Sequence, residues 1–170
     1  NERIIENGCI VIEGNTIKEV GDTSLIKCKY EDNEHEYIDA EGKIIMPGMI
    51  NTHHHIYSEF ARGLDFKNEK LQSFTDILKN VWWKLDKKLT LEDLRYSAYT
   101  AFIECIKNGV TTVFDHNSSP MSISGSLPTI SNVADELGIR GCYCYEVSDR
   151  DGNRVLDLAI KENIDFIKYA

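Results

Sequence analysis

The chain has 170 residues, of which 42% are hydrophobic and 28% are charged, and it carries a formal net charge of −9 at pH 7. This composition is typical of a globular chain and excludes the fibrous and disordered classes. The acidic excess also disfavours nucleic acids and anionic membrane surfaces as partners, because both repel a negatively charged protein.

Cysteine usage and hydropathy indicate a cytoplasmic protein. The five cysteines show no disulfide-framework spacing, so we expect free thiols in a reducing compartment. No apolar run approaches the roughly 20 residues of a membrane span, and the first residues lack the pattern of a signal peptide. Since the chain opens on Asn1 rather than Met, we expect its natural start to lie upstream.

The opening third, residues 3–46, reads as strands with almost no helical periodicity. A Gly14-Asn15 turn between two runs rich in Ile and Val predicts a hairpin, and "EYIDAEGKIIMPG" predicts further strand structure. The character of the sequence changes at Pro47-Gly48, which predicts a domain boundary there, with one domain over residues 1–48 and another over 49–170.

The second part alternates between strands and helices. Thr90 and Asp93 resemble a capping box at the start of a helix that ends near Gly109. The last predicted helix, residues 154–168, is expected to face inward through Val155, Leu158, Ile164 and Ile167. The remaining predicted elements are strands at "MINTHHH", "VTTVFD" and "IRGCYCYEV" and helices over residues 71–88 and 126–137.

Three strand-helix units in series predict a parallel sheet covered by helices, an α/β fold. A closed barrel of this type takes eight units and about 250 residues. A barrel interpretation therefore requires that most of the barrel lies outside this chain, and an open three-layer sheet is the alternative.

"PGMINTHHH" places three consecutive histidines at the end of the first of these strands. Because successive strand residues point to opposite faces, His53 and His55 are expected to share one face, and His54 is expected to pack on the other. Two imidazoles that converge at the carboxyl end of a strand predict half of a metal site, for Zn²⁺ or Fe²⁺. Solvent-facing loop histidines are the alternative.

The context of these histidines resembles a known family. "IDAEGKIIMPGMINTHHH" is similar to the opening signature of the amidohydrolase superfamily. "YSEFARGL", "VWWKLDKKLTLEDL", "ECIKNGVTTVFDH" and "CYEVSDRDG" resemble its aminohydrolase and chlorohydrolase branch, which is cytosine deaminase-like, and most closely the SsnA type. The resemblance implies part of a small β-sandwich domain over residues 1–48. It also implies the first three βα units of an incomplete TIM-type (β/α)8 metal-dependent hydrolase barrel over 49–170.

The resemblance further implies one divalent metal ion, Zn or Fe, held by His53 and His55 together with a histidine and an aspartate from later strands. The proton-handling residues of the family also lie on later strands, so no catalytic residue is expected in this chain, and the chain alone is expected to be inactive. The implied reaction is deamination of a purine- or pyrimidine-like heterocycle by metal-bound hydroxide, in a full-length homo-oligomer. Hydrolysis of a cyclic amide, release of chloride, and a truncated binding module without activity are the alternatives.

Three residues are candidates for substrate binding. His116 follows "VTTVFD" and either lines the pocket or caps the loop after it. Trp82 ends a helix expected near the pocket mouth, where it either stacks on a flat heterocycle or packs in the core. Arg62 either holds an anionic substrate group or forms an ion pair with an acidic residue.

Two further features have competing interpretations. Asn51 stands where other superfamily members have Asp, which favours deamination over cyclic-amide hydrolysis, or it bonds nearby backbone at the strand end. Cys142 and Cys144 share a strand face and are predicted to be small core residues rather than zinc ligands, because zinc sites place cysteines further apart.

Overall fold

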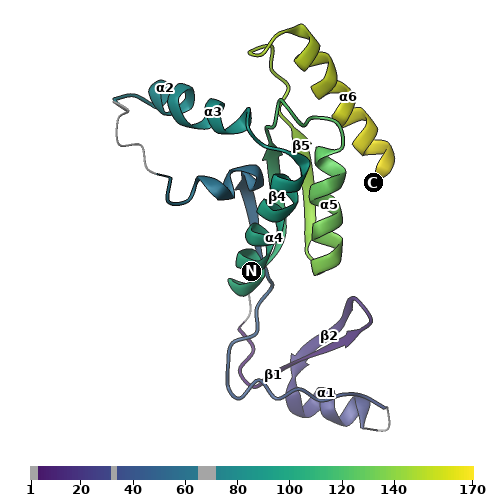
Figure 1. Ribbon diagram of the computed structural model, residues 1–170. Coiled ribbons are helices and arrows are strands. Elements are labelled where there is room, and N and C mark those ends of the chain that lie inside the picture. Colours follow the sequence, from purple (N-terminus) through teal and green to yellow (C-terminus); the bar gives the residue numbers. More distant parts are fainter. Residues whose placement is uncertain (1–3, 32–33, 65–71) are drawn as a thin grey trace. The chain divides into compact units, whose positions relative to one another are not determined.

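A computed structural model describes residues 4–31, 34–64 and 72–170 (Figure 1). The chain divides into two compact units, Asn1–Pro47 and Gly48–Ala170. Among the described residues, no helix is both long and apolar enough to cross a membrane.

The first unit contains the predicted hairpin. Strands β1 (Gly8–Glu13) and β2 (Thr16–Asp22) pair antiparallel, and Gly14 has the positive φ of 57° that the tight turn between them requires. The purely β prediction for this part was wrong, because helix α1 (Thr23–Tyr30) follows at once, with the Asp22 carboxylate accepting from Ser24 N at 2.8 Å as its N-cap. Residues 36–48 form no strand, and a turn at Glu41 and Gly42, both with positive φ, interrupts them.

The second unit is a parallel three-stranded sheet in the order β3-β4-β5, as the alternating pattern predicted. The strands are β3 (Met49–His54), β4 (Val110–Asn117) and β5 (Arg140–Tyr145). Helices α4 (Leu91–Lys107), α5 (Ser126–Leu137) and α6 (Asn153–Tyr169) pack on the sheet (Figure 1). The core between sheet and helices includes Phe102, Val113, Leu127, Ile130, Tyr143 and Phe166.

The segment between β3 and α4 is less regular than predicted. A 3-10 helix, η1 (Ile56–Ala61), follows β3 directly. The predicted helix over residues 71–88 is divided into α2 (Phe74–Ile77), a π-helical turn η2 (Leu78–Trp82) and α3 (Trp83–Asp86), and residue 71 lies outside the described residues. A π-turn inserts an extra residue and redirects the side chains that follow, so a regular 3.6-residue pattern does not describe this segment.

The capping box of α4 is confirmed: Asp93 N donates to Thr90 Oγ1 at 3.2 Å, and Thr90 N donates to Asp93 Oδ2 at 2.8 Å. The inward face predicted for the last helix was wrong in part, because Ile164 and Ile167 are 47% and 77% exposed. The buried residues of α6 are Ala159, Glu162 and Phe166.

A polar contact explains this orientation of α6. The Glu162 carboxylate accepts hydrogen bonds from Gly125 N at 2.9 Å and from Leu127 N at 3.0 Å, at the start of α5. Backbone N–H groups in the first turn of a helix have no partner within the helix, so this carboxylate satisfies two of them. The face of α6 that carries Glu162 is therefore turned inward, and the isoleucines are not.

The two faces of the sheet differ. Val113, Tyr143 and Tyr145 are buried beneath the helices. On the opposite face, Phe114 is 44% exposed, and Cys142 and Cys144 are exposed free thiols. Both cysteines point to the face that the helices leave open in this chain, so their expected place in the core of a complete barrel stays a prediction.

Replacing Glu162 by Ala is expected to lower the free energy of unfolding by about 2 kcal/mol, because the N–H groups of Gly125 and Leu127 lose their carboxylate acceptor. Urea denaturation of wild type and variant measures this difference. An unchanged midpoint and slope would show that the contact contributes nothing to stability.

Candidate metal centre

His53 and His55 converge on the open face of the sheet. Between β3 and β4 the register shifts, so that Asn51 pairs with Val113 and His54 with Asp115, with one extra residue in β3. Asn51 and His54 therefore lie on the helix-covered side. The His53 and His55 rings lie on the other side, with their Nε2 atoms 3.1 Å apart. The predicted convergence of the two rings is thus observed.

This geometry fits a shared metal ion. Two imidazole nitrogens bound to one tetrahedral Zn²⁺ at about 2.0 to 2.1 Å lie about 3.3 Å from each other. Two Nε2 lone pairs at 3.1 Å repel one another unless a proton or a cation lies between them. Residues 4–31, 34–64 and 72–170 contain no group of three or more His, Cys, Asp or Glu side chains arranged to hold a metal ion. The pair therefore offers two of the four ligands of a tetrahedral ion.

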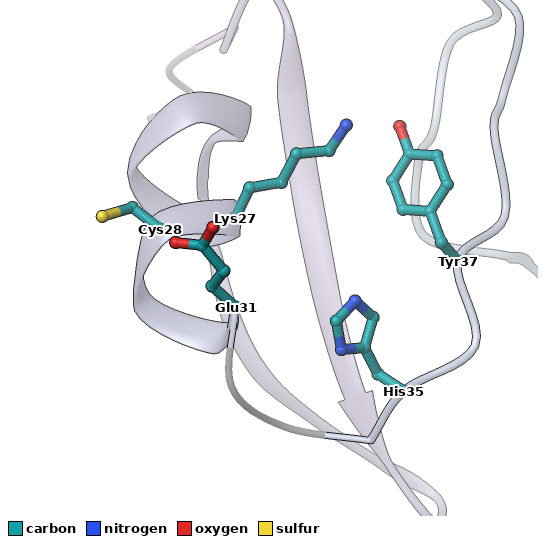
Figure 2. Close-up of a pocket in the computed structure, with 5 residues that line it drawn as sticks. All are labelled: Lys27, Cys28, Glu31, His35 and Tyr37. Carbon is teal, nitrogen blue, oxygen red and sulfur yellow. The ribbon is translucent and has the colours of Figure 1, made fainter.

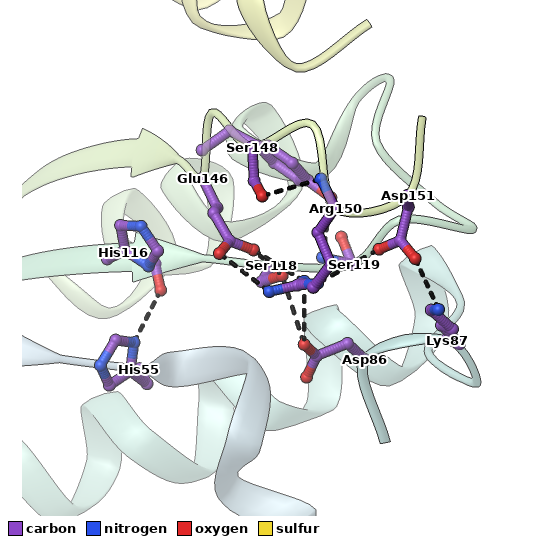
Figure 3. A network of polar contacts seen from close by, with 11 residues as sticks. His55, Asp86, Lys87, His116, Ser118, Ser119, Glu146, Ser148, Arg150 and Asp151 are labelled. Atoms are coloured by element: carbon purple, nitrogen blue, oxygen red, sulfur yellow. Dashed lines mark hydrogen bonds and ion pairs between the residues drawn. The ribbon is translucent and has the colours of Figure 1, made fainter. Parts of the chain in front are cut away.

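The orientation of the His55 ring is set by β4. Its Nδ1 lies 3.0 Å from the backbone oxygen of His116 (Figure 3). A carbonyl oxygen only accepts, so Nδ1 carries the proton and the lone pair is on Nε2, the atom that faces His53. A histidine that binds a metal usually donates its other ring N–H in this way.

His54 packs on the helix side of the sheet, as expected. Its ring lies between two carboxylates, with Nδ1 4.0 Å from Asp115 Oδ1 and Nε2 4.0 Å from Glu59 Oε1. Burial lowers the pKa of His54, against the raising effect of Glu59. His54 is therefore neutral at pH 7, and it points away from the pair formed by His53 and His55.

The three predicted substrate-binding residues differ in burial and in the groups they contact. The His116 ring centroid is 5.5 Å from that of His55, and His116 Nδ1 is buried without a hydrogen-bond partner among the described residues. Burial lowers the pKa of His116. Trp82 is half-buried at the end of the π-turn. Arg62 forms an ion pair with Glu59 at 3.3 Å and has a side chain that is 69% exposed.

Asn51 bonds nearby backbone, which was one of the two interpretations of this residue from the sequence. Its Oδ1 accepts from His53 N at 3.2 Å. This contact holds the backbone at the extra residue of β3, just before the histidine pair.

Sequence reasoning missed a partly buried ionic network at the carboxyl ends of β4 and β5 (Figure 3). Arg150 binds Glu146 through two bonds of 3.1 and 2.9 Å and lies 3.7 Å from Asp86 Oδ2. Ser118 Oγ donates to Glu146 at 2.7 Å, and the Arg150 guanidinium lies 4.8 Å from the Trp83 ring centroid. Nothing in "WWKLDKK" or "YEVSDRDG" signals that these distant charges meet.

Asp86 is the deepest member of this network, with 1% exposure. Burial raises the pKa of its carboxyl to about 7, although Arg150 acts in the opposite direction. The network joins the end of α3 to the segment after β5.

A separate pocket lies in the first unit, lined by Lys27, Cys28, Glu31, His35 and Tyr37 (Figure 2). The Lys27 ammonium lies 4.3 Å from the centroid of the Tyr37 ring. These residues come from α1 and the segment that follows it, and their arrangement suggests no catalytic group.

The sequence model described as "Amidohydrolase family" matches residues 44–170. This chain belongs to the amidohydrolase family. The match begins just before the Pro-Gly turn and includes the histidine pair and all three strands of the parallel sheet.

Two curated deaminases are similar to this amidohydrolase chain. The 5-methylthioadenosine/S-adenosylhomocysteine deaminase of Halothermothrix orenii is 30% identical over 95% of the chain and 35% of its own length. The 5'-deoxyadenosine deaminase of Methanocaldococcus jannaschii is 31% identical over 94% of the chain and 34% of its own length. The amidohydrolase chain thus spans about a third of the length of the curated relatives it matches.

A solved structure shows the same likeness. A variant of the atrazine chlorohydrolase TrzN from Arthrobacter aurescens, complexed with zinc and atraton, superimposes with a TM-score of 0.62 and 26% identity, over 79% of this chain and 30% of that one. The triazine hydrolase from Arthobacter aurescens, with a TM-score of 0.70 and 24% identity, covers 95% of this chain and 37% of that one. The three-stranded parallel sheet and the antiparallel pair therefore match part of the amidohydrolase fold.

The raised pKa of Asp86 predicts how the stability of this amidohydrolase changes with pH. Because the folded-state pKa of about 7 exceeds the ordinary value of 3.8, the folded protein binds more protons than the unfolded protein between these values. Stability is then expected to fall as pH rises through this window. Asp86→Asn removes the titration, so its loss of stability between about pH 5 and about pH 8 should be smaller than that of wild type.

Urea denaturation of both proteins at the two pH values measures this difference. Equal losses in wild type and Asp86→Asn would contradict the prediction.

Proposed function

We propose that this chain is the amino-terminal part of a metal-dependent aminohydrolase whose active site begins with His53 and His55. The observation that carries the proposal is the 3.1 Å convergence of their Nε2 atoms, with the His55 tautomer set by the His116 carbonyl. The pair lies at the carboxyl end of a parallel strand, where active sites of α/β barrels are built. In this proposal residues 49–170 form the first three βα units of a TIM-type barrel, and residues 1–48 form part of a β-sandwich domain.

His53 and His55 would hold one divalent ion, Zn or Fe. Zinc is supported by the structure of the similar chlorohydrolase, which contains it. When bound, such an ion supplies Lewis acidity and lowers the pKa of a water molecule to about 7. Two imidazoles are also compatible with Fe²⁺, so the donor set alone does not choose the metal.

The reaction we propose is hydrolytic deamination of an aminated purine- or pyrimidine-like heterocycle, which the adenosine-type substrates in the names of the similar deaminases support. The water oxygen bonds to the ring carbon that bears the amino group, and the carbon–nitrogen bond breaks. One proton of the water goes to the leaving nitrogen, which departs as ammonia, and the other stays with the ring product. The group that moves this proton is expected outside these 170 residues.

Three residues of this chain are proposed to contact the substrate. His116 has the strongest support, because its ring is adjacent to His55 and its Nδ1 lacks a partner among the described residues. Trp82 is proposed to stack on the heterocycle. Arg62 is proposed to bind an anionic group, which would have to compete with Glu59 for the guanidinium.

A second candidate function keeps the fold and changes the leaving group. The likeness to an atrazine chlorohydrolase favours release of chloride from a triazine-like ring. Hydrolysis of a cyclic amide, or a binding role without activity, would also be compatible with this fold. The likeness to SsnA-type aminohydrolases rests on the sequence motifs alone, and the homo-oligomer expected of the full-length protein stays a prediction.

His53→Ala and His55→Ala in the full-length protein are each expected to abolish stoichiometric metal binding and any deaminase activity, because each variant removes one of the four ligands expected for the ion. Elemental analysis of dialysed protein measures the metal, with about one ion per chain expected in wild type. His35→Ala, a histidine of the first unit, is the matched control and should keep the metal. Full metal content in the His53 variant would refute the proposed site.

A product assay separates deamination from the competing reactions. Full-length protein incubated with adenosine-type nucleosides, aminated pyrimidines and chlorotriazines is expected to release ammonia from the first two classes. Chloride as the principal product would favour the chlorohydrolase, and a ring-opened acid would favour the cyclic-amide hydrolase.

A further inference from the structure

The backbone directly after His55 is held by a buried carboxylate from β4. Asp115 is 3% exposed, and its Oδ1 accepts a hydrogen bond of 2.6 Å from Ile56 N. Ile56 itself is fully buried. The residue that follows His55 is therefore anchored both by packing and by a buried carboxyl oxygen.

Helix α4 binds the carbonyl group of the same residue, Ile56. Ser97 Oγ donates to the Ile56 carbonyl oxygen at 2.6 Å, and Ser97 is fully buried. The N–H and the C=O of Ile56 are thus both bound by side chains from distant segments. One residue earlier, the His55 carbonyl accepts from Ser58 Oγ at 2.7 Å.

His55 needs such support because it lies beyond the regular part of β3. The strand ends at His54, and His55 has φ −133° and ψ 75° at the start of the 3-10 helix η1. The ladder of the sheet no longer fixes its backbone. A ligand on such a segment is held in place only if other groups restrict its backbone and its ring.

The buried carboxylate is not explained by packing. Asp115 Oδ2 is buried and has no hydrogen-bond partner among the described residues. A buried carboxylate oxygen without a partner costs free energy, and a neutral acceptor would bind the Ile56 N–H with a smaller penalty. Asp115 Oδ1 lies 4.0 Å from His54 Nδ1, beyond hydrogen-bond distance, but 2.6 Å from Ile56 N, one residue after His55. The acidic group therefore acts on the backbone next to the histidine pair.

We propose that Asp115, assisted by Ser97, is a positioning residue that fixes His55 for metal binding. Asp115 holds the backbone after His55, and the next residue of β4 offers the carbonyl that orients the His55 ring. One strand thus sets both the position and the tautomer of the ligand. This inference rests on the proposed metal-binding function of His53 and His55.

The test measures metal affinity in the full-length protein without reference to activity. Apo wild type, Asp115→Ala, Asp115→Asn and Ser97→Ala are titrated with Zn²⁺ against a chromophoric chelator, and with Co²⁺ followed by its visible absorption. Asp115→Ala is expected to weaken Zn²⁺ binding about 10- to 100-fold and to change the Co²⁺ spectrum, as loss of an outer-shell partner does. Asp115→Asn keeps an acceptor oxygen and should restore most of the affinity.

Ser97→Ala keeps the inference testable if Asp115→Ala does not fold. This variant is expected to weaken Zn²⁺ binding about fivefold, because it loses the hydrogen bond to the Ile56 carbonyl. Glu162→Ala is the matched control, because it also removes a buried carboxylate that binds backbone N–H groups, but at the start of α5. It should lower thermal stability and leave metal affinity unchanged.

The outcomes separate the two proposals. If wild type binds no metal, the proposed function fails and the inference fails with it. If wild type binds metal, and the folded Asp115 and Ser97 variants bind Zn²⁺ with wild-type affinity and show the wild-type Co²⁺ spectrum, the inference alone is overturned. An equal loss of affinity in Glu162→Ala would also overturn it, because general destabilisation would then explain the effect.

Discussion

The parallel pairing of β3 with β4 is the constraint on which the candidate site depends. It joins segments about sixty residues apart, starting with the hydrogen bond from Met49 N to Gly109 O. Further along, the same pairing brings the His55 ring to the His116 carbonyl and the Ile56 N–H to the Asp115 carboxylate. Without this pairing, nothing from β4 would fix the tautomer or the orientation of the His55 ring.

The irregularity in this pairing is equally important. The extra residue between Asn51 and His54 shifts the alternation of β3, so that His53 and His55 reach the open face while His54 faces the helices. As a result, Asp115 and Glu59 lie near His54 on the side that the helices cover. The rings of His53 and His55 face each other on the open side. Carboxylates are thus kept apart from the two nitrogens that a metal ion would share.

Prediction from sequence succeeded where the signal is local. The α4 capping box, the helix that ends at Gly138 and the hairpin at Gly14 involve residues a few positions apart, and each was found. Prediction failed where distant groups decide the outcome. The contact of Glu162 with the start of α5 left Ile164 and Ile167 exposed, although Val155 and Leu158 of the same predicted face pack against the core.

The sequence by itself determined the strand-helix order, the position of the histidine motif and its likeness to the amidohydrolases, because these depend on residue type and spacing along the chain. Only the tertiary structure decided which nitrogen of His55 faces His53, and that Asp86, Glu146 and Arg150 form one partly buried network. These contacts join residues that are far apart in sequence, and their geometry exists only after the strands have paired and the helices have packed.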